Sequence, residues 1–467
     1  MRRLRQQPRP TAETTSVTYI HAGQVLTREG WRDSVRLRVQ SGRIASMQVG
    51  VPPQAGDERH AIVVPALGNL HSHAFQRAMA GFAEVSGDSA DNFWSWREAM
   101  YRLAHRMNPD QFEAVAAQAY VEMLECGFAR VGEFHYLHHD PAGAPYSDIG
   151  EMSARLLAAA ETSGIGLTLL PVFYAHATFG GAPPKSSQRR FLSTLQSYEA
   201  LLQRCRSLAA RLPAAVVGVA PHSLRAVTPQ ELAVLAALAG TAPVHIHVAE
   251  QVREVEECLV WSGQRPVEWL LDHVPVSTNW CLVHATHVAP QEVQAVARSG
   301  AVVGLCPVTE ANLGDGVFPV PSLLQSHGRF GIGTDSNVHI SLAAELSLLE
   351  YSQRLTVRAR NVVRKEQHST GRAIMEIALA GGAQALGAGG GAIAEGEPAD
   401  FVSLNGDHPA LICRTVDALL DAWIFASAGN VVDGVWVAGT KVVSQGRHIA
   451  RERVAREFVR AMKELHS

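Results

Sequence analysis

Charged residues are scarce in this chain, and no long uninterrupted apolar run is present. Lys, Arg, Asp and Glu make up 18% of the 467 residues, against about 25% in average soluble domains, and 47% of the residues are hydrophobic. This balance excludes an intrinsically disordered chain. The uncharged stretch 377–394 contains six glycines, whereas a membrane-spanning helix needs about 20 consecutive apolar residues. We therefore expect a globular protein and no membrane partner.

The chain also has little net charge and no closely spaced pair of cysteines. A formal charge of −3 provides no overall attraction to nucleic acid, which is not expected as a partner. The six cysteines are scattered without a C-x-x-C pair, which predicts reduced thiols and a cytoplasmic protein, with Cys306 as an inert buried thiol. Residues 1–15 carry four arginines but no apolar segment of a signal peptide, which predicts a disordered leader.

Short β-rich runs alternate with amphipathic stretches between residues 65 and 395, which is typical of parallel βα units. The runs occupy residues 63–71, 129–136, 166–174, 215–222, 244–250, 280–287, 301–307 and 329–335. Helices are predicted between them, for example over 109–127 and over 228–240, where Thr228 can cap the helix and Pro229 can begin it. Eight such strands predict an α/β fold, a (β/α)8 TIM barrel, as the catalytic domain at 65–395.

The two flanks of this region show alternating polar and apolar residues with turn residues between them. Segments 16–64 and 396–449 therefore predict antiparallel strands and hairpins. Because they lie at opposite ends of the chain, we expect them to pair as one small β-sandwich domain, 16–64 plus 396–467, which also contains a C-terminal helix. The glycine-rich stretch 381–391 is predicted to be a joining loop, since no strand-glycine-helix order surrounds it.

His71 and His73 end the first predicted barrel strand and are the first candidates for chemistry. A second H-x-H at 245–247 and a total of 21 histidines make the motif alone a weak signal. Its position is more informative, because alternate residues on a strand share a side and active sites lie at the carboxyl ends of barrel strands. Three further polar residues, His247, His284 and Asp335, lie near the ends of other predicted strands.

These residues predict a mononuclear metal site. Imidazoles of His71, His73 and His247 with the Asp335 carboxylate suit one divalent ion, with Zn²⁺ as the default and Fe²⁺ as the alternative. Water bound to such an ion has a pKa near 7, so the expected chemistry is hydrolysis by hydroxide. The fourth strand has no lysine that could bridge two metals.

Two residues beside this cluster could transfer protons. Glu250 follows His247 by three positions and could protonate a leaving nitrogen; the alternative is a charge that interacts with a helix dipole. His284 could orient and deprotonate the attacking water, and Asp335 could share that proton. Together these roles favour a deaminating hydrolase.

Several segments together resemble a known family. The segments are VVPALGNLHSHAFQRAMAG, HIHVAEQ, LVHATH, LCPVTEANLGDGVFPVPSLL and GIGTDSNVHIS, and over nearly the whole chain the sequence is similar to the mononuclear branch of the amidohydrolase superfamily. More narrowly, HSHAFQRAMAG and the run at 310–316 resemble the formimidoylglutamate deiminases, which hydrolyse N-formimino-L-glutamate to N-formyl-L-glutamate and ammonia in histidine degradation. The resemblance implies the same ligand and proton-transfer residues, and a homodimer.

The resemblance also implies substrate-binding residues. They are Gln76, Arg97, Tyr136, His222 and Arg225. Guanidinium groups can hold the two carboxylates of such a small anionic substrate in paired hydrogen bonds. Arg97 lies well past its strand, and a solvated surface role is the alternative for either arginine.

Two other functions remain open. Another mononuclear amidohydrolase, such as an aminopurine deaminase, would need aromatic rings that stack on its substrate in place of two arginines. A catalytically silent scaffold barrel is the third hypothesis, because fold alone does not prove activity. The presence of both Glu250 and His284 argues against a scaffold.

Overall fold

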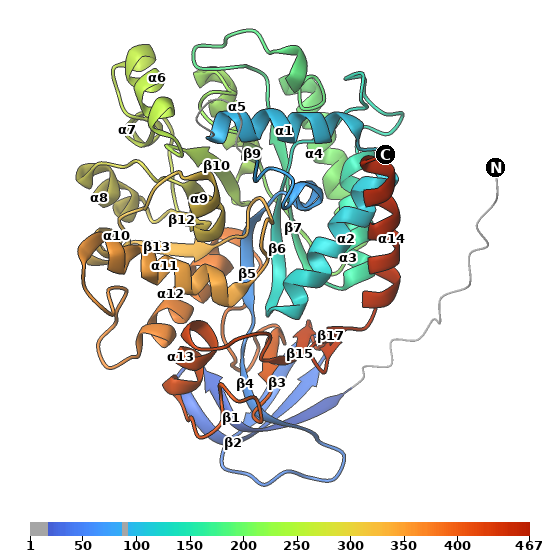
Figure 1. The fold of residues 1–467 in the computed structure, drawn as a ribbon, viewed down its shortest axis with the longest axis vertical. Helices are drawn as coiled ribbons and strands as arrows, with labels where there is room; N and C mark the ends of the chain where they lie inside the picture. The colour runs from blue at the N-terminus through green and yellow to red at the C-terminus, as the bar shows by residue number, and fades with distance from the viewer. Residues whose placement is uncertain (1–16, 86–91) are drawn as a thin grey trace, which may run out of the picture.

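The computed structural model describes residues 17–85 and 92–467. The leader predicted for residues 1–15 lies outside these described residues. Figure 1 shows a barrel of strands surrounded by helices, with a β-rich domain at one end of it. The chain enters the barrel directly from that domain, because β4 (Glu58–Pro65) of the β-rich domain is followed at once by the first barrel strand.

The barrel is built from parallel strands in chain order. They are β5 (Leu67–Ser72), β6 (Phe128–His135), β7 (Gly166–Phe173), β8 (Val216–Val217) with β9 (Ala220–Pro221), β10 (Val244–Val248), β11 (Trp280–His284), β12 (Val302–Leu305) and β13 (Arg329–Ile332). Strands β5 to β8 form one sheet and β10 to β13 another. Bridges between Ser72 and Asp335 and between Val219 and Val244 join the two sheets. The predicted TIM barrel is confirmed.

The fourth barrel strand differs from its prediction, because the run 215–222 is interrupted at Gly218. The Gly218 N–H still bonds to a carbonyl of β7, whereas the next N–H, that of Val219, bonds to the Pro243 carbonyl at 2.9 Å. A Cβ on Gly218 would lie 2.5 Å from that carbonyl oxygen, so only glycine permits this close approach. The strand therefore splits into β8 and β9.

Helices follow the barrel strands and surround them. They are η1 (Ala74–Met79), α1 (Phe93–Arg106), α2 (Pro109–Glu125), α3 (Glu151–Ser163), η2 (Ser186–Gln188), α4 (Leu195–Ala209), α5 (Pro229–Ala239), α6 (Val252–Ser262), α7 (Pro266–His273), α8 (Pro290–Ser299), α9 (Pro307–Leu313), α10 (Val320–Gln325), α11 (Leu342–Val357) and α12 (Thr370–Leu386). Thr228 caps α5 as expected, since its hydroxyl accepts the Glu231 N–H at 3.2 Å. No helix among the described residues is both long and apolar enough to cross a membrane.

Both ends of the chain contribute to the β-rich domain. Its strands are β1 (Thr18–Thr27), β2 (Gly30–Gln40), β3 (Arg43–Gln48), β4, β14 (Phe401–Leu404), β15 (Val432–Val437), β16 (Thr440–Ser444) and β17 (Arg447–His448), joined in the order β17-β16-β15-β14-β4-β1-β2-β3. The predicted small domain from both termini is confirmed. Its pairs are antiparallel as expected except β1 with β4, which are parallel because the chain crosses from β3, at the edge of the sheet, to the other side of β1 before β4 begins. Buried Ile20, Leu37, Phe401 and Trp436 belong to its apolar core.

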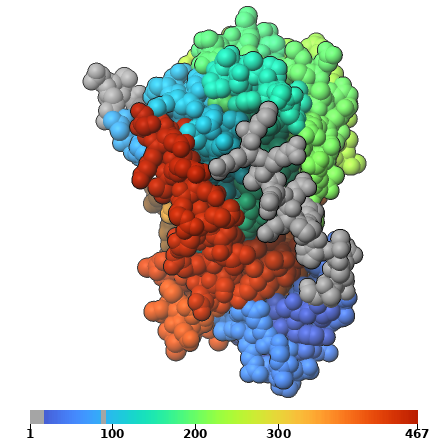
Figure 2. Space-filling model, turned by 90° about the vertical axis from the view of Figure 1, so that its right-hand side faces the viewer, coloured from blue at the N-terminus to red at the C-terminus, as the bar shows by residue number. Residues whose placement is uncertain are grey.

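The C-terminal segment contains α13 (Asp417–Phe425) and α14 (Arg451–Leu465). The sequence placed the final helix with the β-rich domain, but α14 packs against α2 of the barrel (Figures 1 and 2). Val454, Ala461 and Leu465 form its buried stripe, at the spacing of one helix face. The domain boundaries at 65 and 395 stay a prediction.

Candidate metal and catalytic site

Four predicted ligands converge at the carboxyl ends of the barrel strands. His73 directly follows β5, His247 is on β10, and Asp335 lies three residues beyond β13. The Asp335 Oδ1 atom is 3.4 Å from His71 Nε2 and 3.1 Å from His73 Nε2, and the two Nε2 atoms of His71 and His247 are 3.0 Å apart. One ligand atom from each of the four residues lies within 4.8 Å of the others, so they can hold one ion.

The hydrogen bonds behind these rings fit a cation. His73 donates Nδ1–H to the Phe134 carbonyl at 2.9 Å, and His247 donates Nδ1–H to the His222 carbonyl at 3.0 Å. Each ring therefore directs the lone pair of Nε2 inward, and His73 directs it at the Asp335 carboxylate. His73 Nε2 and Asp335 Oδ1 are both electron-rich and lie 3.1 Å apart, so they repel each other unless a positive charge lies beside them. The donor set and its backbone partners therefore fit a divalent cation.

The ionisation of the ligands agrees with this role. Burial lowers the pKa of His71 to about 3 and also holds the pKa of His247 well below its usual value. Burial opposes ionisation of Asp335, but the neighbouring His71 and His73 imidazoles hold the pKa of this carboxyl well below its usual range. Neutral imidazoles with an ionised carboxylate are the forms that bind metals.

His284 and Glu250 lie beside the ligand cluster. His284 Nε2 is 3.7 Å from Glu250 Oε1 and 3.9 Å from Asp335 Oδ2. Burial lowers the pKa of His284, but the carboxylates of Glu250, Glu310 and Asp335 outweigh it and raise the pKa to about 10. Burial also raises the pKa of Glu250. His284 thus favours accepting a proton, and Glu250 retains its proton to higher pH than an exposed carboxyl does.

The backbone is strained at two of these positions. His284 has φ of 66° and Asp335 has φ of 42°, which is the left-handed region that non-glycine residues rarely adopt. Such conformations cost about 1–3 kcal/mol each and cluster at active sites. His284 is the last residue of β11 and Asp335 lies three residues beyond β13, and both side chains turn toward the same space.

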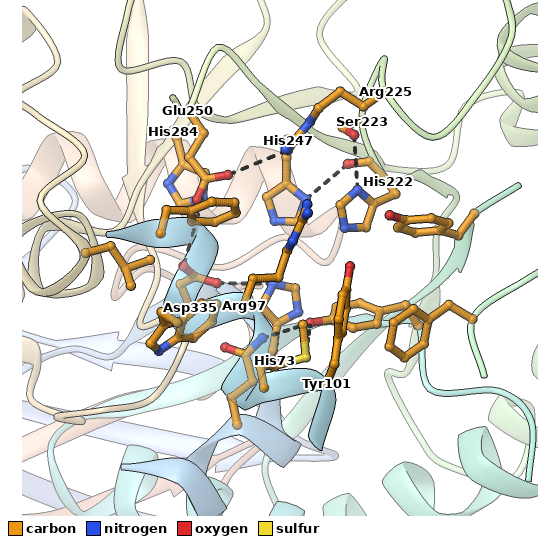
Figure 3. Close-up of a pocket in the computed structure, with 18 of the residues that line it drawn as sticks. His73, Arg97, Tyr101, His222, Ser223, Arg225, His247, Glu250, His284 and Asp335 are labelled. Atoms are coloured by element: carbon orange, nitrogen blue, oxygen red, sulfur yellow. Dashed lines mark hydrogen bonds and ion pairs between the residues drawn. The ribbon is translucent and has the colours of Figure 1, made fainter. Parts of the chain in front are cut away.

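Every substrate-binding residue predicted from the sequence lines one cavity with this cluster. Figure 3 shows His73, Arg97, His222, Arg225, His247, Glu250, His284 and Asp335 around it, and Gln76 and Tyr136 also line it. Gln76 Nε2 donates to the Tyr136 hydroxyl at 2.8 Å. His71 is fully buried and does not line the cavity, so its role at the site is that of a metal ligand.

Both arginines have unused hydrogen-bonding capacity. The Nε atoms of Arg97 and Arg225 are buried without a hydrogen-bond partner among the described residues. Arg225 lies 3.8 Å from carboxylate oxygens of Glu250 and Glu254, beyond hydrogen-bonding distance. Two cationic groups with free donors at one cavity favour an anionic ligand.

Some residues of the site were not predicted from the sequence. They are Phe93, Trp96, Met100, Tyr101, Tyr174, Ala177, Phe191, Ser223 and Leu313 in the cavity wall, and Glu310 behind His284. Tyr174 ends a predicted strand and Tyr101 follows Arg97 by one helical turn, so both carried a positional signal. Glu310 belongs to the run that carried the resemblance, but no pattern linked it to His284.

Family models match both parts of the chain. The Amidohydrolase family matches residues 62–442, and a model described as "Formimidoylglutamate deiminase HutF, N-terminal domain" matches residues 17–61. A formimidoylglutamate deiminase of Pseudomonas aeruginosa is 51% identical over 451 residues, which cover 96% of this chain and 99% of that protein. An 8-oxoguanine deaminase of the same organism is 26% identical over 92% of this chain and 96% of its own length.

Solved structures show the same architecture. An amidohydrolase from Brucella melitensis superposes with a TM-score of 0.93 at 53% identity, and the match covers 96% of this chain and 100% of the other. An adenosine deaminase from Xanthomonas campestris with bound zinc has a TM-score of 0.80 at 20% identity, over 96% of this chain and 98% of that one, a likeness of fold alone.

Proposed function

Because the chain belongs to the amidohydrolase family and, within it, to the formimidoylglutamate deiminases, we propose that it hydrolyses N-formimino-L-glutamate to N-formyl-L-glutamate and ammonia. The observation that carries the proposal is one cavity that joins a His-His-His-Asp cluster to two arginines with free donors. The cluster supports hydrolysis, and the arginines support a substrate with two carboxylates. The step belongs to histidine degradation.

One divalent ion per subunit is held by His71, His73, His247 and Asp335, with Zn²⁺ as the first choice and Fe²⁺ as the second. Nitrogen ligands with one carboxylate support this order. When bound, the ion supplies hydroxide near neutral pH for attack on the amidine carbon.

The proton-transfer residues act on either side of that carbon. His284 and Asp335 accept the proton of the attacking water. Glu250 gives its proton to the imine nitrogen, and a second proton transfer lets that nitrogen leave as ammonia. One water is added and one ammonia is released, so the amidine becomes a formamide.

The remaining cavity residues bind and orient the substrate. Arg97 and Arg225 hold the two carboxylates, and an analogue without one of them would leave the buried Nε donor of that arginine without an acceptor. Gln76, Tyr136 and His222 lie close to the ligand cluster and can hydrogen-bond the formimino group; the Gln76–Tyr136 hydrogen bond fixes two of these side chains relative to each other. The substrate is thereby oriented with its amidine toward Glu250.

Quaternary structure and location are also proposed. A homodimer is what the family resemblance favours. A cytoplasmic location is supported by the cysteines, all of which are free thiols in the structure: Cys126, Cys205, Cys258, Cys281, Cys306 and Cys413.

A direct test measures ammonia and N-formylglutamate from the purified, metal-loaded protein. We expect both products in equal amounts from formiminoglutamate, with guanine and cytosine unchanged. Aromatic side chains do line the cavity, but so do both arginines, and an aminopurine has no carboxylate to accept hydrogen bonds from their free Nε donors. Ammonia released from guanine in preference to formiminoglutamate would overturn the proposal, and no turnover of any amidine or aminopurine would favour a scaffold.

A further inference from the structure

Glu310 is a buried carboxylate behind the reacting groups. It lies in the short helix α9, and its side chain is 8% exposed. Its Oε1 atom is 3.2 Å from His284 Nδ1 and accepts the Cys306 N–H at 3.0 Å. Glu310 touches none of the four proposed ligands through a hydrogen bond in the described structure, so its contact with the site passes through His284.

One oxygen of Glu310 is shared by the Cys306 N–H and the imidazole. As a carboxylate, Glu310 only accepts hydrogen bonds, so it accepts from both. The proton between Glu310 and His284 therefore belongs to His284 Nδ1, whether the ring is neutral or charged. His284 Nε2 then becomes the atom that exchanges protons, and it is the atom that faces Glu250 and Asp335.

The backbone alone does not fix this ring. His284 ends β11 in a left-handed conformation, and rotation of the ring about its Cβ–Cγ bond would exchange Nδ1 for a carbon atom. That rotation would remove the hydrogen bond to Glu310, so the carboxylate opposes it. His73 and His247 are oriented through backbone carbonyls instead, so His284 alone among these three rings depends on a side chain.

We propose that Glu310 is a positioning residue for the hydrolytic reaction, which orients His284 and keeps a proton on its Nδ1 so that Nε2 exchanges protons with the reacting groups. The inference rests on the proposed function, because turnover of formiminoglutamate is one of its measures. Removal of the carboxylate partner of a metal-ligating histidine costs about 10- to 100-fold in activity, and we expect the same range for the partner of His284.

The test compares Glu310→Ala with Glu310→Gln. The glutamine can keep its oxygen on the Cys306 N–H and still accept from Nδ1, so we expect kcat within about threefold of wild type. In Glu310→Ala, kcat should fall about 10- to 100-fold, while KM and metal content stay unchanged. Glu345→Ala is the matched control, since Glu345 is also buried and accepts the Val308 N–H of α9 at 2.9 Å without an interaction with His284.

Each outcome decides the proposal. Wild-type kcat in Glu310→Ala, or an equal loss in Glu345→Ala, would overturn it. Should the alanine variant not fold, ¹⁵N NMR of histidine-labelled wild-type protein, with His284→Gln to assign the resonance, tests the same point. A proton on Nδ1 supports the proposal and a bare Nδ1 overturns it. The NMR result needs no substrate, so it stands even if formiminoglutamate proves not to be the substrate.

Discussion

Substitution of Arg97 by methionine gives a clean test of how the site recognises an anion. Arg97 lies in the cavity wall with its guanidinium carbon 4.5 Å from the Trp94 ring centroid, and its Nε has no partner among the described residues. Methionine keeps much of the side-chain length but removes the charge and the donors. Arg225, by contrast, faces Glu250, so its removal would also disturb the proton donor.

The expected change in KM follows from the hydrogen bond between Arg97 and the substrate carboxylate that Arg97→Met would remove. A hydrogen bond to a charged group contributes about 1.5–3 kcal/mol, and each 1.4 kcal/mol is about tenfold in affinity. Arg97→Met should therefore raise KM for formiminoglutamate about 10- to 150-fold and leave kcat within a fewfold. Steady-state ammonia release measures both constants. Arg102→Met is the control, because Arg102 is exposed on the same helix. An unchanged KM, or a loss confined to kcat, would refute carboxylate binding by Arg97.

Three further predictions concern residues around the same cavity. Glu250→Gln should bind metal normally but lose about 10²- to 10⁴-fold in kcat, and wild-type turnover would exclude it as the proton donor. Trp94→Leu should raise KM for formiminoglutamate at least about twofold but leave KM for formamidine unchanged. The indole centroid lies 4.5 Å from Cζ of Arg97 and 4.8 Å from Cζ of Arg253, and each such cation–π contact contributes about 0.5–1 kcal/mol. An equal change in KM for both substrates would contradict this role. Burial raises the pKa of Asp315 to about 9, so between pH about 4 and 9 the folded state holds a proton that the unfolded state has released, and stability falls as pH rises through this range. Asp315→Asn should therefore raise the melting temperature at pH 8.5 but not at pH 4. An equal gain at both pH values would reject the assignment.

The barrel could be predicted because its signals are local. Each parallel strand is buried on both faces and appears as an apolar run, and the residue that ends it is polar where it faces the mouth. His73, His247 and Asp335 were found in this way. The break at Gly218 was not, because it depends on the carbonyl of Pro243, which directly precedes β10.

The β-rich domain and the final helix show a second limit. Alternation predicts strands and their exposed faces, but it does not specify which strands pair, so the parallel pair β1–β4 was missed. The buried stripe of α14 predicts that the helix packs on something, and only the tertiary structure identifies α2 as its partner. Glu310 was missed for the same reason, since its contact with His284 joins helix α9 to the end of strand β11.

The most direct measurement is an anomalous difference map at the zinc edge from crystals of the zinc-loaded protein. We predict one strong peak per subunit, about 2.0–2.2 Å from Nε2 of His71, His73 and His247 and from a carboxylate oxygen of Asp335. A peak at another position, or none in a protein that still releases ammonia from formiminoglutamate, would contradict the account.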